Sequence, residues 1–459
     1  MTLSLSTLPA DILLEVVNFL HLPDPLSLLS TCSYTYRLSN ERSFWLSVLE
    51  TTRRKSPIAC PRHTDLSQYT LDTLKDLAIS WLKLQTNWSR PFPRLAHPVT
   101  STALPEDVDI VFVVPGTDIL LLSTARTVLC WDVKLNEPFP LPAIEIDGPV
   151  ADVSAPSEAP GITCVAFLVQ TNDIMGRRHV LTITHEARKA VSFTGIYSEF
   201  SCPSGPHYKS VFLTEDVVGT AAVVHGRRDC TFTVGAVTGS DDQPDSTSVL
   251  KLPHNFSYKR EIIVSVAYKG HLYHLIEDGH SVQIQHIARN SLLSGECEQA
   301  GLYSSDVLPA VVYDPFFYSS FCMIPSTPQY GVGAMFARRT DTDLAISFVP
   351  ATLTDAVDDG LSSPLTFGAP SVSKIIQGKE LSMWLDHSGF NAALVVESAT
   401  AINLLLLRYH PDTNRISQHT LEVPGSIDLD APNAVCVDDT AGAVHLVDKQ
   451  GVLWTLRYV

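Results

Sequence analysis

The stretch IVFVVPGTDILLLSTARTVLCWDV, residues 110–133, decides the fold of this chain. It contains three short apolar runs, at residues 110–114, 119–124 and 128–133, and turn residues separate them. Short runs rich in Val, Ile and Leu that are bounded by Gly, Pro and Asp are typical of β-strands, because strands are short and tight turns need residues with special backbone angles. The stretch therefore predicts three successive strands joined by turns.

This unit resembles one blade of a WD-repeat β-propeller, including the pair Trp131-Asp132 that closes its third strand. The same pattern of three short apolar runs recurs, less regularly, at residues 262–287 and 434–458. In the second of these units, Val447-Asp448 takes the place of the Trp-Asp pair. Units centred near residues 130, 175, 225, 275, 335, 395 and 445 lie about fifty residues apart, close to propeller repeat lengths. The resemblance implies an all-β propeller of about seven degenerate, WD-like blades over residues 101–459.

Six or eight blades stay open, because residues 239–247 and 356–363 read equally well as loops or as strands. Leucine-rich repeats are disfavoured, since the chain has no Leu-x-x-Leu-x-Leu series, and kelch repeats are disfavoured because paired glycines are missing at the starts of the units. We expect the last strand, near residues 453–458, to sit in a sheet that strands from both ends of the domain complete, because this removes exposed edges.

The first fifty residues follow a helical pattern instead. Pro9 is suited to the first turn of a helix, and the apolar residues that follow lie on one helical face: Ile12, Leu13, Val16, Val17 and Leu20. Asp24 and Pro25 are expected to start a second helix, in which Leu26, Leu29, Cys32 and Tyr36 share a face. A third helix, capped by Ser39 or Asn40, carries Phe44, Trp45, Val48 and Leu49.

The order of these residues resembles the F-box, a small all-α domain. The resemblance implies that residues 1–50 bind a Skp-type adaptor and, through it, a cullin. The middle segment STCSYTY, residues 30–36, departs from the Val-Ser/Cys-Arg-x-Trp pattern of the family. The adaptor-binding residues that the resemblance implies are Leu8, Pro9, Ile12, Leu13, Val16, Leu20, Leu22, Pro23, Leu26, Leu29, Phe44 and Trp45. The alternative is a helical subdomain that merely packs on the rest of the chain.

Residues 51–100 are interpreted as a linker with a connecting helix. The basic run at residues 53–55 and the Pro-, Cys- and His-containing stretch up to Thr64 precede a helical pattern that starts at Leu71. Pro91 ends this helix, and Trp81 and Trp88 supply the large apolar area that a rigid junction with the propeller needs.

Composition limits the partners and the compartment. The net charge of −17 argues against nucleic acid as a partner, because duplex binding needs a basic surface. The nine cysteines are scattered without any Cys-x-x-Cys pair, which indicates reduced thiols. The apolar runs fall short of the ~20 residues that span a bilayer, and no basic stretch of the signal-peptide kind opens the chain. We therefore expect a cytoplasmic or nuclear protein that binds no membrane.

Catalytic motifs are missing from the sequence. There is no Gly-x-Ser-x-Gly elbow and no phosphate-binding Gly-x-x-x-x-Gly-Lys-Ser/Thr loop. Asp386-His387-Ser388 holds the residue types of a catalytic triad, but consecutive residues of a strand point to opposite faces, so we interpret it as a strand end or turn. His271, His274, His280 and His286 are interpreted as strand residues, with no metal and no cofactor expected.

A ring of arginines is the candidate substrate site. When the units are aligned, the turns between their second and third strands hold Arg126, Arg177, Arg178, Arg227, Arg228, Arg338 and Arg339. Such turns share one rim of a propeller, and the guanidinium group suits phosphate and carboxylate, so the expected target is an acidic or phosphorylated protein. The alternative is that arginine is simply tolerated in exposed turns.

Two functions from different classes follow from the resemblances. The first is a non-catalytic substrate-recognition subunit of an SCF-type (Skp-cullin-F-box) ubiquitin ligase, in which the F-box binds the adaptor and the propeller binds the target. The second is a propeller scaffold whose F-box recruits no ligase. An enzyme with its site in the propeller channel is a third interpretation, for which the sequence offers no motif.

Overall fold

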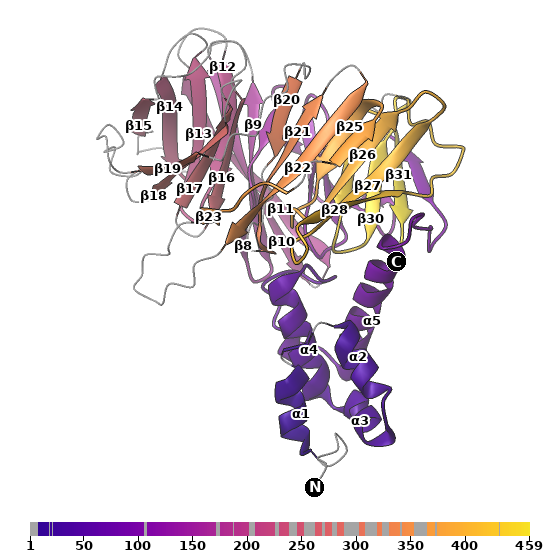
Figure 1. Cartoon of the computed structure of the whole chain (residues 1–459). Helices are drawn as coiled ribbons and strands as arrows, with labels where there is room; N and C mark the ends of the chain where they lie inside the picture. The colour runs from indigo at the N-terminus through magenta and orange to yellow at the C-terminus, as the bar shows by residue number, and fades with distance from the viewer. Residues whose placement is uncertain are drawn as a thin grey trace.

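The structure is a computed structural model with an α-helical part on one side and a large β part on the other (Figure 1). Most of the helices project from one face of the β part (Figure 1). The residues that it describes are 8–17, 19–20, 22–104, 108–170, 175–186, 188–201, 207–224, 229–237, 246–251, 262–268, 271–277, 282–288, 303–307, 319–323, 330–339, 342–352, 365–371, 374–430 and 432–459.

Within the described residues, the helical part contains five α-helices and two short 3₁₀ helices. They are α1 (Ala10–Val17), α2 (Pro23–Leu29), α3 (Ser33–Arg37), η2 (Leu38–Asn40), α4 (Arg42–Lys55), η3 (Leu66–Gln68) and α5 (Leu71–Trp88). The predicted helix starts after Pro9 and at Leu71 are confirmed. The predicted second helix is wrong, because it is two helices: Cys32 has an extended backbone, and its capping contacts with Thr35 begin α3.

The helical core extends past the boundary predicted at residue 50. Phe44 and Trp45 meet edge to face, with ring centroids 5.3 Å apart, and both are buried. The same cluster includes Ile58, Cys60, Leu66, Leu74 and Ala78, and α4 itself runs through residue 50. The predicted linker is therefore part of the helical body.

The strands pair into antiparallel sheets, seven of which are given by the described residues. The first three sheets contain β2 (Asp109–Val113), β3 (Ile119–Ser123), β4 (Thr127–Asp132), β5 (Glu137–Pro138) and β6 (Ile144–Glu145); β7 (Val150–Val153), β8 (Ser157–Ala159), β9 (Ile162–Gln170), β10 (Met175–Glu186) and β11 (Lys189–Ser201); and β12 (His207–Leu213), β13 (Val217–Val224), β14 (Asp229–Ala236) and β15 (Ser246–Lys251). The next two contain β16 (Ile262–Tyr268), β17 (His271–Glu277), β18 (Val282–Ala288) and β19 (Tyr303–Val307); and β20 (Ser319–Met323), β21 (Val332–Arg339), β22 (Asp343–Thr352), β23 (Thr366–Phe367) and β24 (Lys374–Gln377). The last two contain β25 (Lys379–Leu385), β26 (Asn391–Glu397), β27 (Ile402–His410) and β28 (Arg415–Thr420); and β29 (Ala434–Asp438), β30 (Ala443–Val447), β31 (Val452–Arg457) and β1 (Thr100–Ala103).

Contacts run from each sheet to the next in chain order. They join β2 to β7, β7 to β12, β12 to β16, β16 to β20, β22 to β25 and β25 to β29, and β29 contacts β2 again. A series of small antiparallel sheets that follow one another and return to the first is the arrangement of a β-propeller. The three strands predicted from residues 110–133 are confirmed to within one residue as β2, β3 and β4.

The last sheet contains strands from both ends of the β part. β1 pairs with β31 from Thr100 opposite Thr455 to Ala103 opposite Val452, which confirms the predicted sharing of this sheet. The predicted equivalence of Val447-Asp448 and Trp131-Asp132 is wrong. Asp448 follows β30, the second strand of its unit, whereas Asp132 ends β4, the third strand of its unit. Both carboxylates nevertheless act alike, since each accepts hydrogen bonds from two backbone N–H groups of the following turn.

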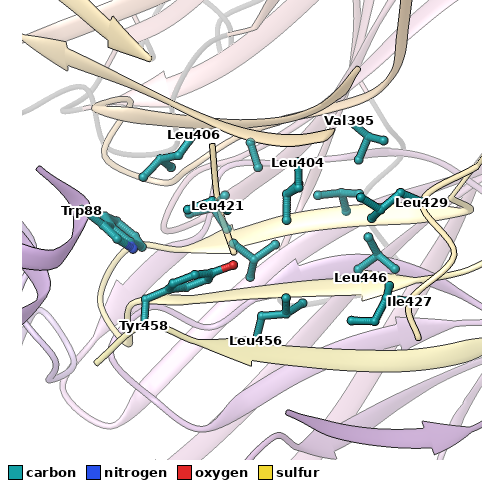
Figure 2. Close-up of a cluster of buried hydrophobic side chains, with 14 of the residues drawn as sticks. Trp88, Val395, Leu404, Leu406, Leu421, Ile427, Leu429, Leu446, Leu456 and Tyr458 are labelled. Carbon is teal, nitrogen blue, oxygen red and sulfur yellow. The ribbon is translucent and has the colours of Figure 1, made fainter. Parts of the chain in front are cut away.

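A buried cluster joins α5 to the last two sheets. Trp88 from α5 lies at its edge near Tyr458, and Leu404 and Leu421 lie nearer its middle (Figure 2). Asn87 also donates from Nδ2 to the carbonyl oxygen of Tyr458 at 2.7 Å. The connecting helix and the role predicted for Trp88 are confirmed, whereas Trp81 packs against the helical core.

Two glycine turns let the helical part approach the sheets closely. Gly116 has φ of 74°, and a Cβ at this position would lie 2.2 Å from the carbonyl carbon of Cys60. Gly442 has φ of 61°, and its Cβ would lie 2.5 Å from a methyl group of Leu84. Because both positions need left-handed backbone and empty space, only glycine fits there without a shift of the helical part.

Candidate docking surface

The N-terminal helices expose apolar side chains to solvent. Ile12 and Val16 on α1 are 45% and 39% exposed, Phe19 just beyond the helix is 80% exposed, and Tyr36 on α3 is 63% exposed. In Figure 1, α1 and α3 lie at the end of the helical part that is farthest from the sheets. We call these four residues the docking surface. Exposed apolar residues that lie close together on a surface are candidates for contact with a partner.

The predicted adaptor-binding residues divide into two groups. Seven are exposed or half-buried, namely Leu8, Pro9, Ile12, Val16, Leu20, Pro23 and Leu26. Five are buried, namely Leu13, Leu22, Leu29, Phe44 and Trp45. On α1 this division follows the helical period, since Leu13 and Val17 face inward while Ile12 and Val16 face outward. The buried five hold the helices together and are not accessible to a partner in this conformation.

Polar contacts fix the shape of the docking surface. Tyr34 Oη donates to the carbonyl oxygen of Leu8 at 2.8 Å, which ties α3 to the segment before α1. Trp45 Nε1 donates to the carbonyl oxygen of Ser39 at 2.8 Å, which ties α4 to η2. The exposed carboxylate residues Asp11 and Asp24 lie on α1 and α2, so acidic groups border the apolar residues.

Two residues of the docking surface were missed by the sequence pattern. Phe19 follows the last turn of α1 and is off the apolar face that was predicted, although an aromatic residue beside a helix end was a readable signal. Tyr36 was predicted on the inner face of the second helix. The break at Cys32 turns α3 away from α2, and the ring becomes exposed as a result.

The predicted arginine ring is corrected by the structure. Arg126 lies in the turn between β3 and β4 and is exposed, as predicted. Arg177 and Arg178 lie inside β10, and Arg338 and Arg339 lie at the end of β21, so none of these four is in a turn. Arg227 and Arg228 lie outside the described residues.

These arginines are used within the protein. Arg178 is fully buried, and its Nη1 donates to the carbonyl oxygen of Thr233 in the next sheet at 3.0 Å. Arg338 is also buried. Arg177 pairs with Asp147 and Glu199, and Arg339 pairs with Glu380 at 3.0 Å. Side chains that are buried or neutralised in this way do not form an open ring of positive charge.

The triad-like segment is a buried turn between β25 and β26, as predicted. Asp386 Oδ1 accepts hydrogen bonds from Ser388 Oγ at 3.1 Å and from the N–H of Gly389 at 2.7 Å. Burial raises the pKa of Asp386 to about 6. No group of three or more His, Cys, Asp or Glu side chains that could hold a metal ion occurs in the part of the chain that the structure describes.

The remaining histidine positions are only partly described. His271 opens β17, the side chains of His274 and His286 fall outside the described residues, and His280 falls wholly outside them. Among the helices that the structure describes, none combines the length and the apolar character needed to cross a membrane.

No protein-family model matches the chain, and no curated protein sequence matches it. Among solved structures, the chain is similar to the β-propeller domain of Myceliophteria thermophila Cps50 (Swd1), with 12% identity, a TM-score of 0.43, and coverage of 80% of this chain and 99% of that one. It is also similar to the C-terminal WD40 domain of Sif2, with 8% identity, a TM-score of 0.40, and coverage of 79% and 84%. These similarities are distant, so the description of the fold rests on the strand pairings and sheet contacts of this chain.

Proposed function

We propose that this protein is the substrate-recognition subunit of an SCF-type ubiquitin ligase, in which the docking surface binds a Skp-type adaptor and the β part binds the target. The observation that supports this most is the exposure of Ile12, Val16 and Phe19 at the free end of the helical part. Each apolar side chain of this size contributes roughly 1.5–3 kcal/mol when a partner buries it. The docking surface is therefore sufficient to anchor an adaptor.

The junction between the two parts suits this role. Arg188 Nη1 donates to the carbonyl oxygen of Ala59 at 2.9 Å while its Nη2 pairs with Asp118 at 2.9 Å, and Trp88 is buried against the last sheets. A target held by the β part would thus stay at a fixed distance from the adaptor. Rate enhancement in such an assembly comes from proximity, and the chain itself performs no chemistry.

The proposal includes the number of blades in the β part and how the last blade is completed. We infer a closed, seven-bladed, WD-like propeller whose last blade is completed by β1. The helical part occupies one face of this propeller, which leaves the opposite face for the target (Figure 1). The proposal places the protein in the cytoplasm or nucleus, with the adaptor, a cullin and a protein target as its partners.

The proposal is tested by co-purification with matched variants. Ile12→Asp/Val16→Asp places two charges on the docking surface, and recovery of a purified Skp-type adaptor is expected to fall about a hundredfold or more. The control is Val191→Asp/Ile196→Asp, which changes the same residue types on β11 at 49% and 44% exposure. Equal recovery of the adaptor with both double variants would refute the proposal.

The scaffold function is the alternative, and the helical segment itself favours it in one respect. The segment from Ser30 to Tyr36 departs from the F-box pattern, and it is where the predicted second helix breaks into α2 and α3. A wild-type protein that is folded but recovers no adaptor at micromolar concentrations would support the scaffold and exclude the ligase subunit.

A further inference from the structure

A cleft of about 670 Å³ lies where the end of α4 and α5 face the fifth and sixth sheets. We call it the junction cleft, and its lining includes Lys55, Trp81, Gln85, Tyr330, Phe390 and Arg408. Its volume is in the range of small-molecule sites, which is roughly 300–1,000 Å³. The docking surface does not contribute to it, so an occupant of the cleft is independent of an adaptor.

Arg408 is the central polar group of the junction cleft. Its Nε donates to Asn391 Oδ1 at 3.2 Å, its Nη1 to Ser89 Oγ at 3.1 Å and its Nη2 to Gln85 Oε1 at 2.5 Å. All three acceptors are neutral, and a guanidinium has five N–H donors, so two remain available. Burial lowers the pKa of Arg408 to about 10, which still leaves it charged at neutral pH.

The cationic side chains of the cleft are bonded differently from several other cations of this chain. Arg53, Arg62, Arg177, Arg188, Arg339 and Lys449 all form ion pairs with Asp or Glu. Among the described residues, no carboxylate lies within 4.0 Å of the cationic nitrogens of Arg54, Lys55 or Arg408, all of which line the cleft. Three cations with no carboxylate partner therefore converge on one cleft in a protein with net charge −17.

The other polar groups of the cleft also suit an anion. The indole N–H of Trp81 is buried and has no hydrogen-bond acceptor. Asp412 and Asp439 are the two carboxyl groups in the lining, and burial together with the charge of Asp386 raises the pKa of Asp439. Burial and the neighbouring Arg408 lower the pKa of His410. The cations thus outnumber the charged acids.

The uncharged part of the lining is aromatic. Tyr330 and Phe390 lie with ring centroids 5.9 Å apart, and both are only half-buried, so their rings are accessible from the cleft. Cationic and aromatic groups in one cleft of this size match a ligand with a phosphate at one end and a flat ring at the other. We propose that the junction cleft binds an organic phosphate, with the phosphate at Arg408 and the ring against Tyr330 and Phe390.

The test is calorimetric titration of the full chain at constant ionic strength with adenosine monophosphate, and with adenosine as the probe that has the ring alone. We expect saturable binding of one adenosine monophosphate per chain and no measurable binding of adenosine. Arg408→Gln should weaken binding about tenfold or more, and Lys55→Ala should weaken it about threefold. Arg415→Ala, in the next strand and outside the cleft, should change nothing.

Two outcomes would overturn the proposal. One is the lack of saturable binding of adenosine monophosphate to the wild-type chain. The other is equal binding by the wild type, Lys55→Ala and Arg54→Ala. Both side chains are exposed, so these two substitutions are not expected to disturb folding. A melting curve of Arg408→Gln separates lost binding from lost structure, because a folded variant melts cooperatively.

Discussion

The two ends of the helical part differ in how far their apolar side chains are exposed to solvent. At the end next to the sheets, Leu84 and Trp88 are 2% and 1% exposed and share a core with the last two sheets. At the free end, Ile12 and Phe19 are 45% and 80% exposed. Burial at one end stabilises the whole chain, whereas the exposed side chains at the other end add little to its stability.

The helices at the two ends also differ in length. The helices near the sheets are long, with α4 and α5 spanning 14 and 18 residues, and turns at Gly116 and Gly442 let them approach closely. The helices at the free end have only 8, 7 and 5 residues. Helices this short gain little from their own hydrogen bonds and depend on packing, which a bound partner would complete.

The largest expected effect comes from removing residues 451–459. This deletes β31, and with it the pairing of β1 and the burial of Leu456 and Tyr458. We expect loss of the cooperative melting transition, because two strands of one sheet and part of the junction core are lost together. Circular dichroism melting checks this, and a truncated chain that keeps the wild-type melting temperature would contradict it.

A pair of aromatic truncations compares the two ends directly. Trp88→Ala should lower the free energy of unfolding by about 3–5 kcal/mol, because it leaves a cavity in a packed core. Phe19→Ala should change it by less than about 0.5 kcal/mol, because the ring is already in water. Urea unfolding of both variants gives the comparison, and similar losses from the two substitutions would show that the free end is also part of the core.

A smaller effect depends on pH. Burial and the neighbouring Asp386 raise the pKa of Asp439 above its ordinary value, and burial raises the pKa of Asp386 to about 6. Because the folded chain favours the protonated carboxyls, this contribution to stability is present at low pH and is lost as pH rises through about 6. The stability of Asp439→Asn relative to the wild type should therefore increase as the pH is raised from 5 to 8.

The matched control for this pH effect is Asp24→Asn on α2. Its carboxylate is exposed, so the difference in stability from the wild type should be the same at both pH values. Urea unfolding at each pH measures both variants. A pH-independent difference for Asp439→Asn would mean that the junction carboxyls are better solvated than their burial indicates.

Local patterns allowed much of the fold to be predicted from the sequence. The strands β2, β3 and β4 were predicted to within one residue, because a short apolar run between turn residues needs no distant partner to be recognised. The break at Cys32 was missed because two short helices and one longer helix have the same apolar period, and only the Thr35 cap separates them.

The sites were harder to predict because their partners are distant in sequence. Arg178 looked like a turn residue, but β10 starts at Met175 and the side chain bonds to Thr233 in another sheet. Arg408 gave no signal at all, since its acceptors Gln85 and Ser89 lie on α5, more than 300 positions away. Only part of the docking surface was predicted. Helical spacing shows which residues lie on the same side of a helix, but it does not show which of them are buried and which are exposed.

Hydrogen–deuterium exchange of the full chain with and without a purified Skp-type adaptor is the most direct test of the central claim. We predict that the adaptor slows exchange of backbone amides in α1, α2 and α3, and leaves exchange unchanged in β11 and in the turn at Arg126. Unchanged exchange across residues 10–37 at saturating adaptor, or protection confined to the sheets, would contradict the claim that the free end of the helical part is the docking surface.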